Sequence, residues 1–180
     1  MPAKNRGLGL ATIGIIGLLG VPTFAIDFYN TQDLSNRMEG AGFRWTLVLA
    51  PEELHALDWI RRWTPPQAVV QVEPFVRDPG TWAYVPAFAE RRMAAGIPIS
   101  MVPVETYTDA SRRVQWMFQS IDPVDISERA SRLHIDYLFI GAPERNAYPG
   151  FEGALAARPD LFRLVFTEKH ISIFYVERHR

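Results

Sequence analysis

Apolar and polar positions divide the chain into three stretches. Residues 7–26 contain no charged side chain, and residues 27–44 are polar with no sustained apolar period, which is typical of a connector. From residue 45 onward, short apolar runs alternate with polar turns, as in a folded domain. We therefore predict a cytoplasmic tip and transmembrane helix at 1–26, a juxtamembrane connector at 27–44, and an extracytoplasmic domain at 45–180.

The first stretch has the length and the flanking charges of a membrane span. As a helix, residues 7–26 would cover ~30 Å, about one bilayer core. Lys4 and Arg6 precede the stretch and Asp27 follows it. Because basic flanks stay in the cytoplasm, we expect a single-pass protein of the cell inner membrane with its C-terminal domain outside the cytoplasm.

Two other interpretations of this stretch are open. Thr23, Phe24 and Ala25 loosely resemble the end of a signal peptide, which would be cleaved to release a soluble module. A buried helix of a soluble protein is disfavoured, because each glycine would cost up to ~1 kcal/mol in water.

Three glycines in this stretch recur at three-residue steps. Gly14, Gly17 and Gly20 would lie along one sector of the helix, where small residues allow another transmembrane helix to approach closely. The general abundance of small residues in membrane spans explains the same pattern without a partner.

The remainder of the chain reads as alternating helices and strands. Helices are predicted at residues 51–63, 85–93, 109–118, 123–133 and 151–157. Strands are predicted at residues 46–49, 68–72, 97–102, 135–140, 161–166 and 171–176. Short joins between helix and strand are typical of α/β proteins. We predict a small α/β domain with a mixed sheet and a C-terminal β-hairpin whose loop is the four residues 167–170.

Local signals place several helix ends. Pro51 suits a first helical position and Thr64 precedes two prolines that stop the helix. Thr108 and Asp122 are predicted to cap the helices that follow them. The apolar side of the helix predicted at residues 51–63 is expected to consist of Leu54, Leu57, Trp59, Ile60 and Trp63.

Composition excludes several functions. The net charge of −1 gives no positive field to hold nucleic acid. No Cys is present, no glycine-rich phosphate loop or GxSxG elbow occurs, and no two of the four histidines have metal-ligand spacing. We expect neither a metal nor a cofactor.

The strongest candidate for ligand binding is a basic pair beyond a short helix. Arg91 and Arg92, with Glu105 nearby in the sequence, could grip a carboxylate or phosphate. A solvated or internally ion-paired helix end explains the same residues. The five tryptophans could stack on sugar rings or fill the core.

The order of these features resembles a known family. The stretches WIRRWTPPQAVV, FAERRMAAGIPIS, HIDYLFIG and LFRLVFTEKHISIFYVE, after an apolar helix, are similar to the C-terminal end of GT-C-type polytopic membrane glycosyltransferases and related bacterial membrane proteins. The resemblance covers almost the whole chain. It implies a last transmembrane helix followed by an extracytoplasmic α/β domain, in enzymes that move a sugar from a polyprenyl-phosphate carrier.

The resemblance transfers no catalytic residue, because the family's catalytic carboxylate lies in an early loop that this sequence lacks. We therefore expect a membrane-anchored accessory or remnant domain without catalysis of its own. Its expected partners are the membrane, transmembrane helices of a glycosyltransferase, and a glycan or lipid-linked sugar. The alternative is an exported soluble module that binds a glycan or an anion after signal cleavage.

Overall fold

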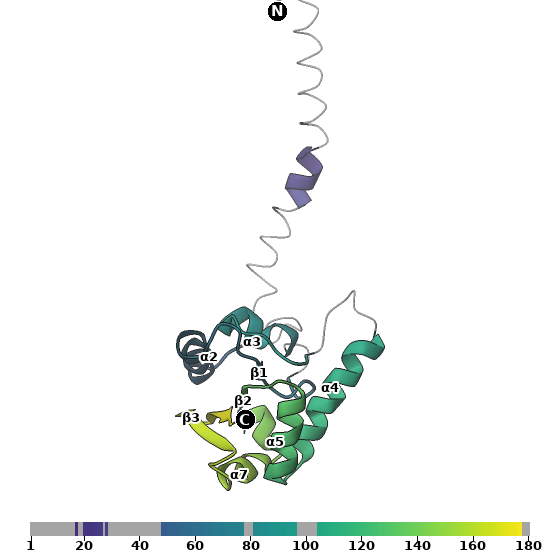
Figure 1. Cartoon of the computed structure of the whole chain (residues 1–180). Helices are drawn as coiled ribbons and strands as arrows, with labels where there is room; N and C mark the ends of the chain where they lie inside the picture. Colours follow the sequence, from purple (N-terminus) through teal and green to yellow (C-terminus); the bar gives the residue numbers. More distant parts are fainter. Residues whose placement is uncertain are drawn as a thin grey trace, which may run out of the picture. The chain divides into compact units, whose positions relative to one another are not determined.

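A computed structural model describes Gly17, residues 20–26, Phe28, and residues 48–77, 81–96 and 104–177 (Figure 1). The chain divides into two units, Met1–Val48 and Leu49–Arg180. All the named helices and strands lie in the second unit. The described residues of the first unit are helical residues near the N-terminus and Val48.

The predicted membrane span lies largely outside the described residues. Gly17, residues 20–26 and Phe28 are helical, so the helix continues past Pro22. Among the residues that the structure describes, none belongs to a helix long and apolar enough to cross a bilayer. Gly14 is not described, and a methyl group added at Gly17 or Gly20 would meet no atom within 4 Å. The connector predicted at 27–44 also falls outside the described residues, apart from Phe28.

The second unit is built on a mixed four-stranded sheet, as the sequence predicts. Its strands are β1 (Val70–Gln71), β2 (Tyr137–Ile140), β3 (Phe162–Glu168) and β4 (Ile171–Val176), in the order β1-β2-β4-β3. β1 and β2 are parallel, and the other two pairings are antiparallel. The hairpin of β3 and β4 is confirmed, but its turn is only Lys169 and His170, because the ladder continues to the pair Glu168 and Ile171.

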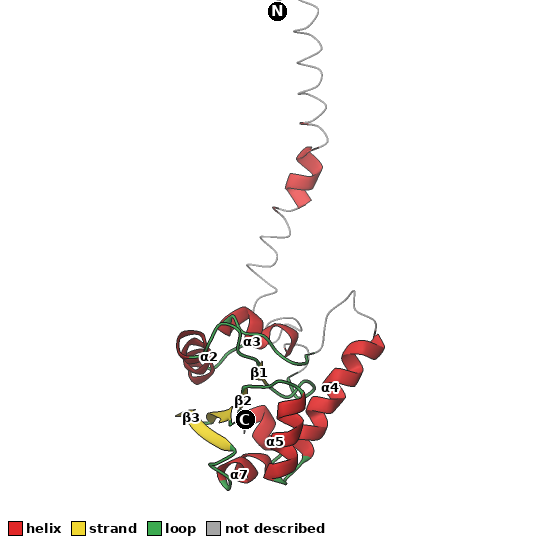
Figure 2. Cartoon of the chain, in the orientation of Figure 1, coloured by secondary structure: helices red, strands yellow, loops and turns green. Residues whose placement is uncertain are grey.

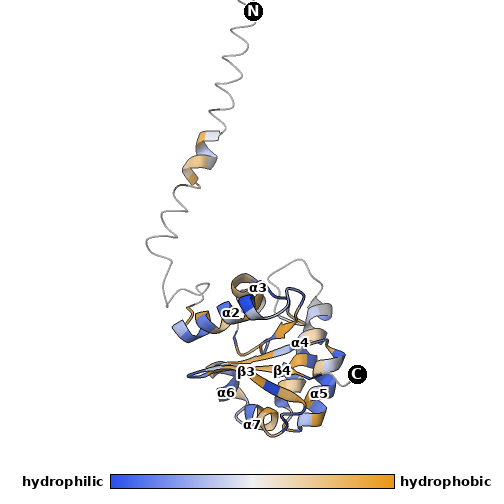
Figure 3. Ribbon diagram, turned by 60° about the vertical axis from the view of Figure 1, so that its left-hand side comes forward, coloured by the Kyte–Doolittle hydropathy of each residue, from blue (hydrophilic) through white to orange (hydrophobic). Residues whose placement is uncertain are grey.

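Helices cover both faces of this sheet (Figure 2). They are α2 (Pro51–Trp63), α3 (Thr81–Ala89), α4 (Val104–Gln119), α5 (Pro123–Arg132), α6 (Ala142–Ala147) and α7 (Phe151–Ala156). In Figures 1 and 3, α2 and α3 lie on one side of the sheet, and α5 and α7 lie on the other. The arrangement is therefore a three-layer α/β/α fold.

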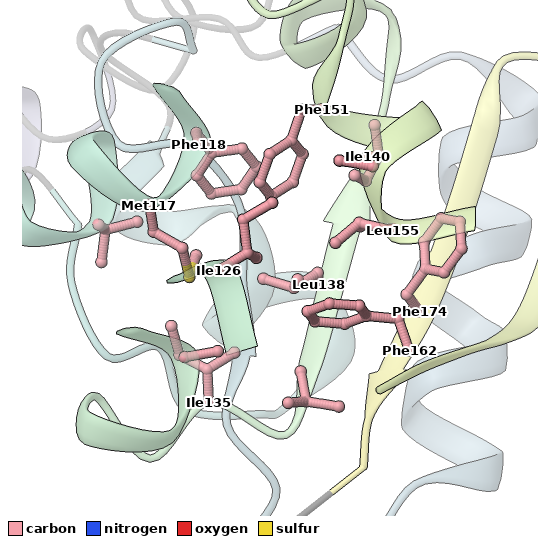
Figure 4. Packing of buried hydrophobic residues seen from close by; sticks show 14 of the residues in the cluster. Met117, Phe118, Ile126, Ile135, Leu138, Ile140, Phe151, Leu155, Phe162 and Phe174 are labelled. Atoms are coloured by element: carbon pink, nitrogen blue, oxygen red, sulfur yellow. The ribbon is translucent and has the colours of Figure 1, made fainter. Parts of the chain in front are cut away.

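Each face of the sheet has its own core. Under α2 and α3, buried side chains of the sheet such as Phe139 and Ile173 pack against Leu57 and Ile60. On the other face, residues of α4, α5 and α7 pack against the sheet (Figure 4). The labelled side chains there are Met117, Phe118, Ile126, Ile135, Leu138, Ile140, Phe151, Leu155, Phe162 and Phe174. Alternation along β2 sends Leu138 to one core and Phe139 to the other.

Several predicted helix ends are confirmed. α2 begins at Pro51 and ends before Thr64, and α5 begins at Pro123. The Asp122 carboxylate accepts a hydrogen bond from the Val124 amide at 2.9 Å, so it is the helix cap that the sequence predicts.

Other predicted boundaries are wrong. Thr108 lies inside α4, which begins at Val104, and α3 begins at Thr81 and ends at Ala89 instead of running from Val85 to Met93. Pro86 is exposed and lies inside α3. Pro86 therefore does not begin the helix.

One strand and one helix also differ from the prediction, and a further predicted strand is not tested. Val48 and Leu49 are not in a strand, residues 46 and 47 are not described, and the strand predicted at 97–102 lies outside the described residues. The helix α6 was missed, because the sequence at 142–147 is short and polar.

The predicted apolar side of α2 is only partly buried. Leu57 and Ile60 are buried and Trp59 is half-buried, but Leu54 is exposed and Trp63 is 73% exposed.

Candidate functional site

Polar side chains gather at both ends of the parallel pair β1 and β2. Because these strands run in the same direction, their carboxyl ends meet at one edge of the sheet and their amino ends at the other. We call these places the carboxyl edge and the amino edge.

The carboxyl edge holds a buried ion cluster, formed by Glu53, Arg77, Tyr84 and Glu144. Arg77 donates to both carboxylate oxygens of Glu144, at 2.6 and 2.7 Å, and to Glu53 at 3.1 Å. The Tyr84 hydroxyl donates to the same Glu53 oxygen at 2.8 Å. The Arg77 guanidinium also lies 4.4 Å from the centre of the Tyr84 ring.

Further bonds fix the two carboxylates of this cluster. The second oxygen of Glu53 accepts from the Ala50 amide, and Glu144 accepts from the Gly141 amide at 2.9 Å. Burial opposes the charge of Arg77, but the attraction of Glu144 outweighs it and raises the pKa of Arg77. The ion cluster joins the start of α2 to the end of β2, and its groups bind one another.

Glu73 is a fully buried carboxyl group near this cluster. One of its oxygens accepts from the amides of Phe75 and Val76, both at 2.6 Å, and the other accepts from the Tyr148 hydroxyl at 3.2 Å. Burial raises the pKa of Glu73 above its ordinary value. These bonds close the turn that follows β1, which is a structural role.

The amino edge, in contrast, is open to solvent. A hollow of about 390 Å³ lies there, which we call the amino-edge hollow. Its lining comes from the loop after α2, the start of β1, the segment after α3, the segment after α5, the start of β2 and the end of β4. The lining residues are Pro65, Gln67, Ala68, Val69, Arg92, His134, Asp136, Tyr137 and Tyr175.

Two tyrosine rings lie in this hollow. Tyr137 and Tyr175 are paired across β2 and β4, with ring centres 5.2 Å apart, and both are half-buried. Arg163 continues the row on β3, with its guanidinium 5.2 Å from the Tyr175 ring. Burial raises the pKa of Tyr137, and its hydroxyl, protonated at neutral pH like that of any tyrosine, can donate a hydrogen bond.

Charged and polar groups border the rings. Asp136 accepts from the Val69 amide at 2.9 Å, which holds its carboxylate beside the start of β1. Arg92 is exposed and donates to the Gln67 carbonyl at 3.1 Å. His134 is exposed after α5 with a φ of 56°, a left-handed conformation that turns the chain into β2.

The loop after α2 forms one wall of the hollow. Thr64 and the prolines after it end the helix at Trp63, and the chain then turns into β1. Tyr137 and Tyr175 are half-buried at this edge, while Phe139 and Ile173 farther along the same strands are buried.

The structure separates the three residues that the sequence analysis grouped as a ligand site. Arg91 is buried and donates to the hydroxyl and carbonyl of Thr64 and to the Arg61 carbonyl, so it closes the end of α2. Arg92 points to the amino-edge hollow. Glu105 is exposed in the first turn of α4.

Sequence reasoning did not find the other residues of the hollow. Asp136, Tyr137 and Tyr175 were interpreted only as parts of strands, although Tyr at an alternating strand position was a signal that a polar ring lies on one face. Among the described residues, no group of three or more His, Asp or Glu side chains could hold a metal ion.

A pair of neighbouring tyrosine rings, inclined at 57° to one another, with a guanidinium and a carboxylate at its border suits a particular kind of ligand. The rings offer an apolar face, and the charged groups offer donors and an acceptor at its rim. A ring-shaped molecule with apolar faces and a polar edge matches this arrangement.

Comparison with known proteins identifies no family for this chain. No protein-family description and no curated protein matches the chain. A solved structure, the C-terminal globular domain of an oligosaccharyltransferase from Archaeoglobus fulgidus, matches with a TM-score of 0.49 and 10% identity, covering 73% of this chain and 100% of that one. At this TM-score and identity the match assigns no family, and no residue role passes from that domain to this chain.

Proposed function

We propose that this chain is a membrane-anchored accessory domain that binds carbohydrate outside the cytoplasm and leaves catalysis to a partner. The observation that carries the proposal is the open Tyr137 and Tyr175 pair beside Arg92 and Asp136. A sugar ring has C–H faces that pack on aromatic rings and hydroxyl groups that pair with charged side chains.

The charge of the protein favours carbohydrate over nucleic acid as the ligand of these rings. Nucleobases also stack on tyrosine, but a nucleic acid carries a phosphate at every base, and a net charge of −1 gives no extended positive field to hold so densely charged a chain. The hollow is also of the size usual for small-ligand sites.

The anchor and the partner rest on the sequence. Residues 7–26 are uncharged and follow Lys4 and Arg6, which supports an inner-membrane span with the folded unit outside. The resemblance to GT-C glycosyltransferases supports a partner of that class, contacted in the membrane through Gly14, Gly17 and Gly20.

Carbohydrate binding is tested by calorimetry with the full chain in detergent micelles and soluble oligosaccharides as ligands. Tyr175→Ala should weaken binding about tenfold or more, the equivalent of losing one stacked ring. Trp116→Ala is the matched control, because Trp116 is a half-exposed aromatic residue of α4, on the opposite side of the sheet. Equal affinities of wild type and Tyr175→Ala would overturn the proposed site.

Anchoring is tested by washing membranes with alkaline carbonate. We expect the intact chain to stay in the membrane fraction. Release of an intact chain would contradict the anchor. Release of a chain that begins at Ile26, measured by mass spectrometry, would favour the alternative of an exported soluble module.

A further inference from the structure

A second hollow adjoins the first on the same face of the sheet. It has a volume of about 500 Å³ and is lined by Trp59, Trp63, Tyr137, Arg163, Leu164 and Val165. Tyr137 lines both hollows, so they meet at its ring. We call the second one the tryptophan hollow.

Exposed aromatic surface marks the tryptophan hollow. Trp59 is held in place by Phe166, with ring centres 5.6 Å apart. Trp63, one helical turn farther on, is 73% exposed. Because an exposed Trp gains little from folding, its position beside a hollow points to contact with a ligand.

Each hollow also has one arginine. Arg92 borders the amino-edge hollow and Arg163 borders the tryptophan hollow. Arg163 is paired with Glu177 at 2.9 Å, but both side chains are exposed and such pairs are weak. A carboxylate on a ligand can therefore compete for Arg163.

We propose that the two hollows form one groove for a linear acidic oligosaccharide, with neighbouring sugar units in contact with Tyr137. This inference rests on the proposed function and adds the chain length and the charge of the ligand. One sugar unit fills only part of either hollow, so a chain is needed to reach from Tyr175 to Trp63.

Two series of probes test the groove by calorimetry with the full chain in micelles. Hyaluronan di-, tetra- and hexasaccharides carry carboxylates, and chitooligosaccharides of the same lengths do not. We expect affinity to rise at least about tenfold from the di- to the hexasaccharide, and the hyaluronan series to bind more tightly.

Variants separate the two hollows. Trp63→Ala should remove the gain in affinity with chain length, whereas the control Trp116→Ala should keep it. Arg163→Gln should reduce the preference for the acidic series. Since Trp63 and Arg163 are exposed, these changes leave the buried cores intact.

The outcomes distinguish the inference from the function on which it rests. If the disaccharides bind in a way that Tyr175→Ala weakens, but affinity is independent of length and of Trp63, the groove is wrong and the proposed function stands. Equal affinity for both series would contradict the acidic ligand. If no probe of either series binds, both proposals fail.

Discussion

The two edges of the sheet contain the same kinds of residue, arginine, carboxylate and tyrosine, in different roles. At the carboxyl edge, Arg77 is buried and its guanidinium pairs with two carboxylates and a tyrosine ring. At the amino edge, Arg92 is exposed beside a carboxylate and two tyrosine rings. The difference is burial: groups that saturate one another inside the protein hold it together, and groups that water can reach can bind a ligand instead.

Among substitutions at the two edges, we expect the largest loss of stability when the buried ion cluster is disrupted. Arg77→Met leaves the Glu53 and Glu144 carboxylates buried without their cation, and should lower the free energy of unfolding by ~3–5 kcal/mol. Urea unfolding of the full chain measures the change.

The exposed pair of Arg113 and Asp109 supplies the control. Arg113→Met should lower the free energy of unfolding by no more than ~1 kcal/mol. If Arg77→Met were as mild as this control, the carboxyl edge would not have the structural role assigned to it.

An intermediate effect should separate two neighbouring arginines. Arg91→Gln leaves the carbonyl groups of Arg61 and Thr64 without their donor and should cost about 2–3 kcal/mol of unfolding free energy. Arg92→Gln should change it by less than ~0.5 kcal/mol, yet weaken binding of hyaluronan oligosaccharides. Thermal unfolding and calorimetry measure the two quantities, and a loss of stability in Arg92→Gln equal to that in Arg91→Gln would remove the contrast.

The smallest effect concerns pH. Because burial raises the pKa of Glu73 in the folded state, the folded protein holds this proton more tightly than the unfolded chain. Stability is therefore fully present below the ordinary pKa of Glu and is lost as the pH rises through the raised value. Glu73→Gln keeps an oxygen for the Phe75 and Val76 amides and cannot ionise, so its stability should depend less on pH.

Chemical unfolding of both proteins over a series of pH values checks this expectation. The difference in free energy between wild type and Glu73→Gln should change as the pH rises from mildly acidic to neutral, in favour of the variant. Parallel curves would show that Glu73 titrates alike in the folded and unfolded chains.

The elements that the sequence predicted well have strong signals within a few residues. Asp122 and Pro123 start α5, and the prolines after Thr64 end α2, because capping and proline geometry act locally. The starts of α3 and α4 were misplaced because proline and threonine often stand at the start of a helix, whereas Pro86 and Thr108 lie inside one. The residue type alone does not distinguish the two positions.

The candidate site shows more clearly what the sequence alone cannot predict. Arg91 and Arg92 look equivalent in the sequence, and only the packing of α2 against the sheet decides that one is buried and the other open. Tyr137 and Tyr175 become neighbours through the pairing of β2 with β4, two strands far apart in the chain.

The sequence by itself determined the uncharged N-terminal stretch, the main helix and strand periods, the closing hairpin and the α/β class, since each follows from residues close together in the chain. Only the tertiary structure decided that Tyr137 and Tyr175 stay half-buried at the amino edge, which charges meet at the carboxyl edge, and which rings line the hollows. Burial and pairing of this kind depend on contacts between distant segments, and no short stretch of sequence contains them.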